Sequence, residues 1–77
     1  GKAKKGSAEE REAKKTVARV DRRLAKIAEL ETALHADLEA NSGDYEKLAD
    51  LGAQLQKLLD EREQLELEWL EASELLD

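Results

Sequence analysis

Two stretches of this chain carry a residue pattern in which every step is three or four positions long. The first series is Glu10, Ala13, Val17, Val20, Leu24, Ile27, Glu31, Leu34 and Leu38, and the second is Leu48, Leu51, Leu55, Leu58, Arg62, Leu65, Trp69, Ala72 and Leu76. Such steps keep side chains on one face of an α-helix, and a mostly apolar series sustained over four heptads is typical of a coiled coil. Each stretch is therefore predicted to be a helix that buries one stripe against another helix.

The composition agrees with this pattern. Of the 77 residues, 42% are charged and 40% are hydrophobic, with no proline and no cysteine, as expected of a helical chain rich in Ala, Glu, Lys, Leu and Arg. The lack of cysteine excludes disulfides and thiolate metal sites and fits a reducing compartment. No apolar run approaches the roughly 18 residues of a membrane span. Because the sequence also lacks methionine, we expect a fragment of a longer protein, with Gly1 left from cloning.

A short break separates the two helical stretches. Asn41, Ser42 and Gly43 are turn formers, Gly43 can take a positive φ, and Asp44 is suited to cap the following helix. A link this short forces the helices to run antiparallel. We therefore predict an all-α fold, a two-helix antiparallel coiled-coil hairpin. The predicted boundaries are a flexible basic linker at 1–7 and a hairpin at 8–77, with helices at about 8–40 and 45–76 and the turn at 41–44.

Some details of the hairpin follow from single residues. Ser7 is the expected N-cap of the first helix, with Glu10 reaching back in a capping box. At about 1.5 Å per residue the hairpin should be on the order of 50 Å long. The register stays open, because pairing Leu34 with Leu48 or Leu38 with Leu51 is compatible with the spacing. Gly52 lies within the second helix, where it allows either close helix approach or a bend.

Charge divides the chain into two unlike parts. Residues 1–26 hold ten Lys/Arg against four Asp/Glu, a balance of +6, and residues 27–77 hold three against fifteen, a balance of -12. Lys14 and Arg23 flank the apolar stripe, where they are expected to pair with glutamates of the returning helix. The candidates are Glu61, Glu66 and Glu68.

The other cations of the first helix form what we call the basic face. Its members are Arg11, Lys15, Arg19, Arg22 and Lys26, spaced by 4, 4, 3 and 4 residues, and the linker adds Lys2, Lys4 and Lys5. This spacing predicts one outward face that is not neutralised by the second helix and is suited to a line of phosphates. The alternative is that these cations only solubilise an exposed helix. Without interleaved aromatic residues, any nucleic acid would be held by its backbone and not by its sequence.

A second candidate surface is apolar. Leu67 and Leu70 are predicted to point outward near Trp69 at the acidic end of the second helix, and we call these three residues the docking surface. They are either ordinary exposed leucines or a docking patch for a neighbouring domain or a second copy. His35, one turn from Glu31 and Glu39, is expected to be a surface histidine and not a metal ligand.

The sequence contains no arrangement that indicates catalysis. It has no glycine-rich phosphate loop, and a two-helix hairpin offers no concave pocket to shift the pKa of a carboxylate. We therefore expect this chain to catalyse nothing, to need no cofactor of its own and to hold no metal.

Two runs suggest a family. "SAEEREAKKTVARVDRRLAKIAELETALHADL" and "DYEKLADLGAQLQKLLDEREQLELEWLEASELL" resemble the C-terminal coiled-coil domain of ABC-F proteins, the ATP-binding-cassette ATPases without a membrane domain, especially the Uup-like branch. The resemblance covers nearly the whole chain after the linker. Its most telling parts are the start at Ser7 to Glu12, the run "DYEKLADL", and "EREQLELEWLE" with Trp69.

The resemblance implies that the parent protein is a cytoplasmic, ribosome-associated bacterial ATPase that uses ATP and Mg²⁺. This hairpin would be an accessory arm after the second ATPase domain that contacts DNA or ribosomal RNA through the basic face and the linker lysines. Because residues 41–77 balance three basic against eleven acidic groups, such binding should be weak and salt-dependent. The alternative is a protein-interaction or spacer module that docks on its own ATPase domains or self-associates through the docking surface.

Overall fold

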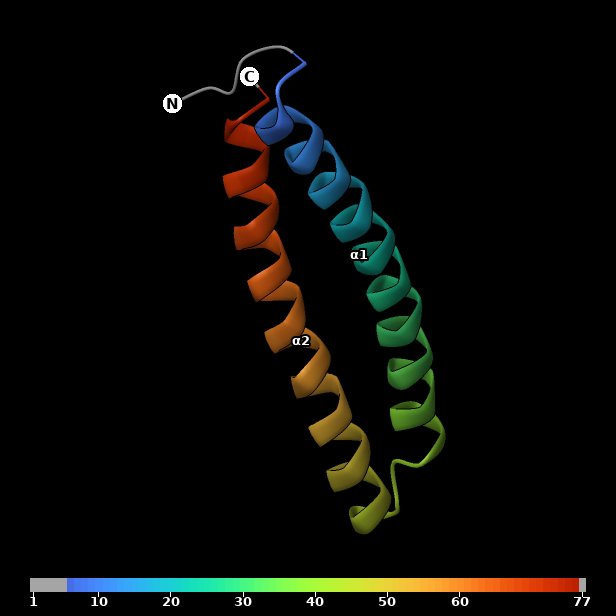
Figure 1. Ribbon diagram of the computed structural model, residues 1–77. Helices are drawn as coiled ribbons and strands as arrows, with labels where there is room; N and C mark the ends of the chain where they lie inside the picture. The colour runs from blue at the N-terminus through green and yellow to red at the C-terminus, as the bar shows by residue number, and fades with distance from the viewer. Residues whose placement is uncertain (1–5, 77) are drawn as a thin grey trace.

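The hairpin consists of two helices joined by one tight turn. The computed structural model describes residues 6–76, in which α1 spans Ala8–Ala40 and α2 spans Tyr45–Glu74. The helices run side by side in opposite directions, with the turn at one end and the start of α1 beside the end of α2 at the other (Figure 1). The molecule measures 56 × 16 × 15 Å. The predicted all-α antiparallel hairpin and its length are confirmed.

The helix boundaries are set by capping residues. Ser7 accepts a hydrogen bond from the backbone N–H of Glu10 at 3.1 Å, and Asp44 caps α2 by accepting from the N–H of Lys47 at 3.1 Å. Both caps were predicted from the sequence. The Glu10 carboxylate reaches one residue further back than a capping box requires, because it accepts from the N–H of Gly6 at 2.9 Å.

The second helix ends two residues earlier than predicted. The N–H groups of Leu75 and Leu76 donate to the carbonyls three residues before them, at 3.1 and 3.0 Å, so the last turn is tighter than an α-helix. In the interhelical turn, the N–H of Asp44 donates to the carbonyl of Asn41 at 3.0 Å. Gly43 does not use a positive φ; Gly6 does, at 76°.

The core is a single line of side chains on each helix. On α1 the buried residues are Ala13, Val20, Ile27 and Leu34, and on α2 they are Leu51, Leu65 and Ala72, nearly all at seven-residue spacing. The other stripe positions are mostly half-buried, since a pair of helices covers each stripe from one side only. Leu24, Leu58 and Trp69 pack against a central cluster of Val20, Ile27 and Leu65.

Ion pairs between the helices reveal the register. Arg23 of α1 lies opposite Glu61 of α2. Counting eleven residues away from this pair in opposite directions, along two helices of equal rise, brings Leu34 to within one residue of Leu51. This pairing lies between the two that the sequence left open. Gly52 does not mediate close helix approach, because a Cβ added there would meet nothing within 4 Å.

Candidate nucleic-acid interface and docking surface

Arg19 does not point away from α2, so its predicted place on the basic face is wrong. Its guanidinium donates to both carboxylate oxygens of Glu68, one of them at 2.8 Å. The side chain of Arg19 stands one residue before the buried Val20 and is long enough to reach across the edge of the stripe. Its charge is therefore used within the hairpin.

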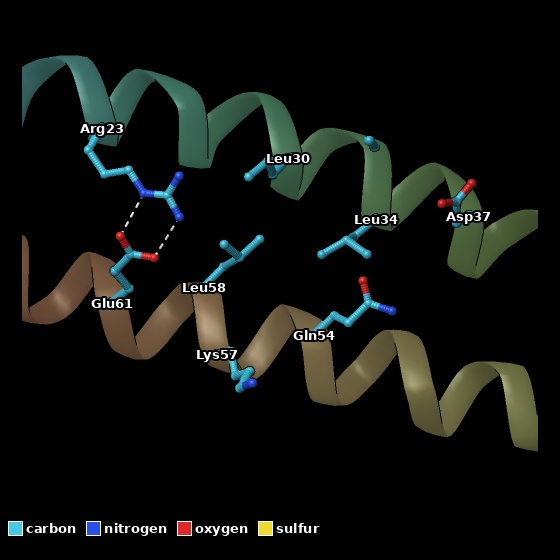
Figure 2. Close-up of a pocket in the computed structure, with 9 residues that line it drawn as sticks. Arg23, Leu30, Leu34, Asp37, Gln54, Lys57, Leu58 and Glu61 are labelled. Carbon is cyan, nitrogen blue, oxygen red and sulfur yellow. Dashed lines mark hydrogen bonds and ion pairs between the residues drawn. The ribbon is translucent and has the colours of Figure 1, made fainter.

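The two residues expected to flank the stripe behave differently. Arg23 pairs with Glu61 as predicted, with its Nε and Nη2 donating at 2.6 and 2.8 Å (Figure 2). Lys14 instead pairs with Glu10 on its own helix, at 3.4 Å. Two arginine–carboxylate pairs therefore cross between the helices on this edge. Arg23 uses two nitrogens for the two oxygens of Glu61, the bidentate geometry that arginine favours, whereas Arg19 donates from Nη2 alone to both oxygens of Glu68.

The rest of the basic face stays on the outside of α1. Arg11, Lys15, Arg22 and Lys26 are all exposed, and their spacing of 4, 7 and 4 residues keeps them on the side opposite Val20. Arg11 donates to the carbonyl of Gly6 at 2.6 Å, and Arg22 forms no ion pair with any residue between 6 and 76.

The two lysines of the basic face have only weak partners. Lys15 lies 3.7 Å from Glu12 and Lys26 lies 3.6 Å from Glu29, in both cases one turn away on the same exposed helix. Such pairs are worth a few tenths of a kcal/mol, so a phosphate can replace the glutamate. The predicted contributions of Lys2, Lys4 and Lys5 lie outside the described residues.

Leu67 and Leu70 are exposed as predicted, with 51% and 54% of their surface open to solvent. They do not form one patch with Trp69, however. Leu70 lines a hollow together with Trp69 and Leu24, whereas Leu67 lines a different one together with Glu68 and Glu71. The predicted docking surface is thus divided between two sides of α2. The sequence reasoning missed Leu24, whose stripe position beside α2 was the available signal.

The opposite side of the hairpin carries a longer hollow of about 670 Å³. Figure 2 shows Leu58 of α2 pointing toward Leu30 and Leu34 of α1, with the Arg23–Glu61 pair at one end. The charges of its lining residues balance, because the two cations of Arg23 and Lys57 are matched in number by the carboxylates of Asp37 and Glu61.

Two carboxyl groups of the hairpin have shifted pKa values. The hydrogen bonds from Arg23 are the main reason why the pKa of Glu61 lies below its ordinary value of 4.5, and the same contact raises the pKa of Arg23. The pKa of Glu10 is also lowered, first by the N–H of Gly6 and further by Lys14. Both shifts reflect contacts that stabilise a charged carboxylate at the surface, a backbone N–H at Glu10 and an arginine at Glu61.

Residues 6–76 contain no cluster of three or more potential metal-ligating side chains. His35 is exposed, and the neighbouring Glu31 is paired with Arg62. Over the same residues there are two helices and no strand, hence no βα unit for binding a nucleotide. Neither helix has a segment apolar enough to cross a membrane.

No protein-family model, no curated protein and no solved structure matches this sequence.

Proposed function

We propose that this hairpin is an accessory coiled-coil arm that contacts the phosphates of DNA or RNA, without sequence specificity, through the outer side of α1. The observation that supports this most is the row of Arg11, Lys15, Arg22 and Lys26 on the side opposite the buried stripe. None of the four pairs with α2 within residues 6–76. From the first to the last the row is about 22 Å long.

The charges of α2 do not cancel this row locally. Glu61 and Glu68, which approach α1, are bound to Arg23 and Arg19. The acidic balance of the second half of the chain still repels phosphate at longer range. Binding should therefore be weak, strongest at low salt and confined to the outer side of α1.

The resemblance of the sequence to the C-terminal arms of ABC-F ATPases supplies the context of the proposal. In that context the arm belongs to a cytoplasmic, ribosome-associated ATPase that uses ATP and Mg²⁺, and this chain itself is a binding module and not an enzyme. The resemblance supports either DNA or ribosomal RNA as the partner.

Titration of the nitrogen-15-labelled chain with a short DNA duplex and with a structured RNA tests the proposal. Amide shifts should concentrate between residues 2 and 26 and fade as salt is raised. If four phosphates are neutralised on duplex DNA, log Kobs against log salt should have a slope of about -3.6. A folded hairpin with unchanged spectra at low salt would rule the proposal out.

Charge reversal on the outer side of α1 provides the matched test. Lys15→Glu combined with Arg22→Glu should weaken binding by about tenfold or more at low salt. Lys47→Glu combined with Lys57→Glu changes the net charge by the same amount on α2 and should have a much smaller effect. Equal losses would mean that only net charge matters, and that the row does not bind.

A second candidate is protein docking, which the exposure of Leu67 and Leu70 favours. The arm would then bind the ATPase domains of its own polypeptide or a second copy. At least one of Leu67→Ser and Leu70→Ser, tested separately in the parent protein, should alter ATPase activity or self-association. If neither substitution changes either property, the docking function is excluded.

A further inference from the structure

An open groove follows one side of the hairpin near its acidic end. A hollow of about 300 Å³ is lined by Asp21, Leu24, Glu66, Trp69 and Leu70. A second hollow, of about 460 Å³, shares Leu24 and Glu66 with the first and adds Ala28, Glu31 and Arg62. Because two residues line both hollows, they form one continuous feature between α1 and α2, which we call the Trp69 groove.

The floor of the Trp69 groove is apolar and firmly supported. Leu24 and Trp69 pack against the core cluster of Val20, Ile27 and Leu65, so both are held in place from below. Leu70 stands at the edge with 54% of its surface exposed. A partner that covers this edge would remove apolar surface from water without rearranging the hairpin.

The charges of the Trp69 groove do not balance. Its lining holds three carboxylates, those of Asp21, Glu31 and Glu66, against the single guanidinium of Arg62. That guanidinium is bound to Glu31 at 2.9 Å and lies 3.5 Å from Glu66. Asp21 has no ion-pair partner in the described part of the chain. The groove on the other side, by contrast, is electrically balanced.

We propose that the Trp69 groove binds an amphipathic helix of a partner protein that carries lysine or arginine beside its apolar stripe. The apolar stripe would cover Leu24, Trp69 and Leu70, and the cations would pair with Asp21 and Glu66. This inference rests on the docking function proposed above and specifies the chemistry of the partner. A helix fits because the groove runs along two antiparallel helices, and Ala28 allows a third to approach closely.

A second copy of the chain fits the groove less well. Two Trp69 grooves face to face would bring the carboxylates of Asp21 and Glu66 toward their own copies, and like charges oppose such contacts. The basic outer side of α1 would supply cations, but between Lys15 and Lys26 it offers only small apolar residues such as Ala18 and Ala25. The large apolar residues of that helix lie in or beside the stripe that faces α2, and not on its outer side.

A pair of synthetic helices serves as the probe. Each has about 18 residues, five turns, with leucines at steps of three and four; one carries lysines beside the leucines and the other carries glutamates. The lysine helix should shift the amide signals of Asp21, Leu24 and Leu70 in a saturable manner and change the fluorescence of Trp69, the only tryptophan. The glutamate helix should do neither.

Two matched pairs of substitutions locate the site. Leu70→Ser should weaken binding of the lysine helix by about tenfold, whereas Leu67→Ser, at a leucine of nearly equal exposure outside the groove, should leave it unchanged. Asp21→Asn should weaken binding as well, whereas Glu74→Gln should not. Equal losses for Leu70→Ser and Leu67→Ser would overturn the assignment of the groove.

The remaining outcomes separate the partner chemistry from the docking function. Binding of the glutamate helix in preference to the lysine helix would overturn the cationic partner but keep a docking surface. Binding of neither helix would overturn the proposal for the groove, whereas the docking function itself is decided by the Leu67 and Leu70 variants of the parent protein. Shifts of the Trp69 and Leu70 signals that depend on the concentration of the chain alone would assign the groove to a second copy and overturn the proposal. Titration of the nitrogen-15-labelled chain with duplex DNA tests the outer side of α1 independently of the Trp69 groove.

Discussion

Arg62 of α2 donates from Nη1 to both carboxylate oxygens of Glu31 of α1, at 2.9 and 3.0 Å. Each of these two charged residues occupies a position in the otherwise mostly apolar stripe of its helix. The Glu31 side chain is 15% exposed and that of Arg62 44%, so water still reaches the pair. A double-mutant cycle with Glu31→Ala and Arg62→Ala should give a coupling free energy of about 0.2–1 kcal/mol in urea unfolding. Zero coupling would mean that the pair contributes nothing to stability.

Replacing this pair by leucine should stabilise the hairpin and reduce its specificity. Glu31→Leu combined with Arg62→Leu creates an apolar layer at this point of the stripe. Well-packed apolar residues often stabilise a protein as much as a buried ion pair does, or more. We expect a higher melting temperature together with greater self-association, since a charged layer limits the alternative registers and partners. Sedimentation and thermal melts measure the two effects. A lower melting temperature with an unchanged monomer would contradict this prediction.

The Arg23–Glu61 pair should make stability depend on pH in the acidic range. The folded pKa of Glu61 lies below its ordinary value of 4.5, so the unfolded chain binds this proton more readily. The stabilisation is therefore complete above the unfolded pKa and is lost as the pH falls through the folded pKa. Arg23→Gln should be less stable than the parent chain at neutral pH, and the gap should close on acidification. Thermal melts across this range, with Lys57→Gln as a control, check it; a gap independent of pH would refute it.

The helices, their caps and the antiparallel turn were predictable, because each depends on residues close together in the sequence. The place of Arg19 was not, since its contact with Glu68 depends on the register and on the reach of a long side chain across the edge of the stripe. The register itself is set by the geometry of the turn, which the spacing alone does not specify. The separation of Leu67 from Leu70 was not predictable either, because it depends on which hollows the packing of α1 against α2 creates beside each leucine.

Ile27 should be among the most sensitive positions in the chain. Its side chain is fully buried, and so is that of Val20 one heptad earlier. Ile27→Ala removes methyl groups from a core that is only one side chain wide, at a cost of about 2–5 kcal/mol. In a hairpin this small, such a loss should reduce the helix content measured by circular dichroism at 25 °C. The milder Ile27→Val should cost about 0.5–1.5 kcal/mol, and Leu67→Ala, at an exposed site, within about 0.5 kcal/mol. Equal effects at Ile27 and Leu67 would contradict the assigned core.

Gly52 and Gly6 form a contrasting pair of glycines. Gly52 lies inside α2 with no positive φ, and a Cβ added there meets nothing within 4 Å, so Gly52→Ala should stabilise the hairpin by about 0.5–1 kcal/mol. For a domain of this size such a gain raises the melting temperature by roughly 4–8 °C per kcal/mol. Gly6 also has open space around it, but its φ is 76°, so Gly6→Ala should be destabilising through backbone strain alone. Thermal melts of the two variants therefore separate helix propensity from backbone conformation. A destabilising Gly52→Ala would show that the glycine holds a bend in α2 that alanine opposes.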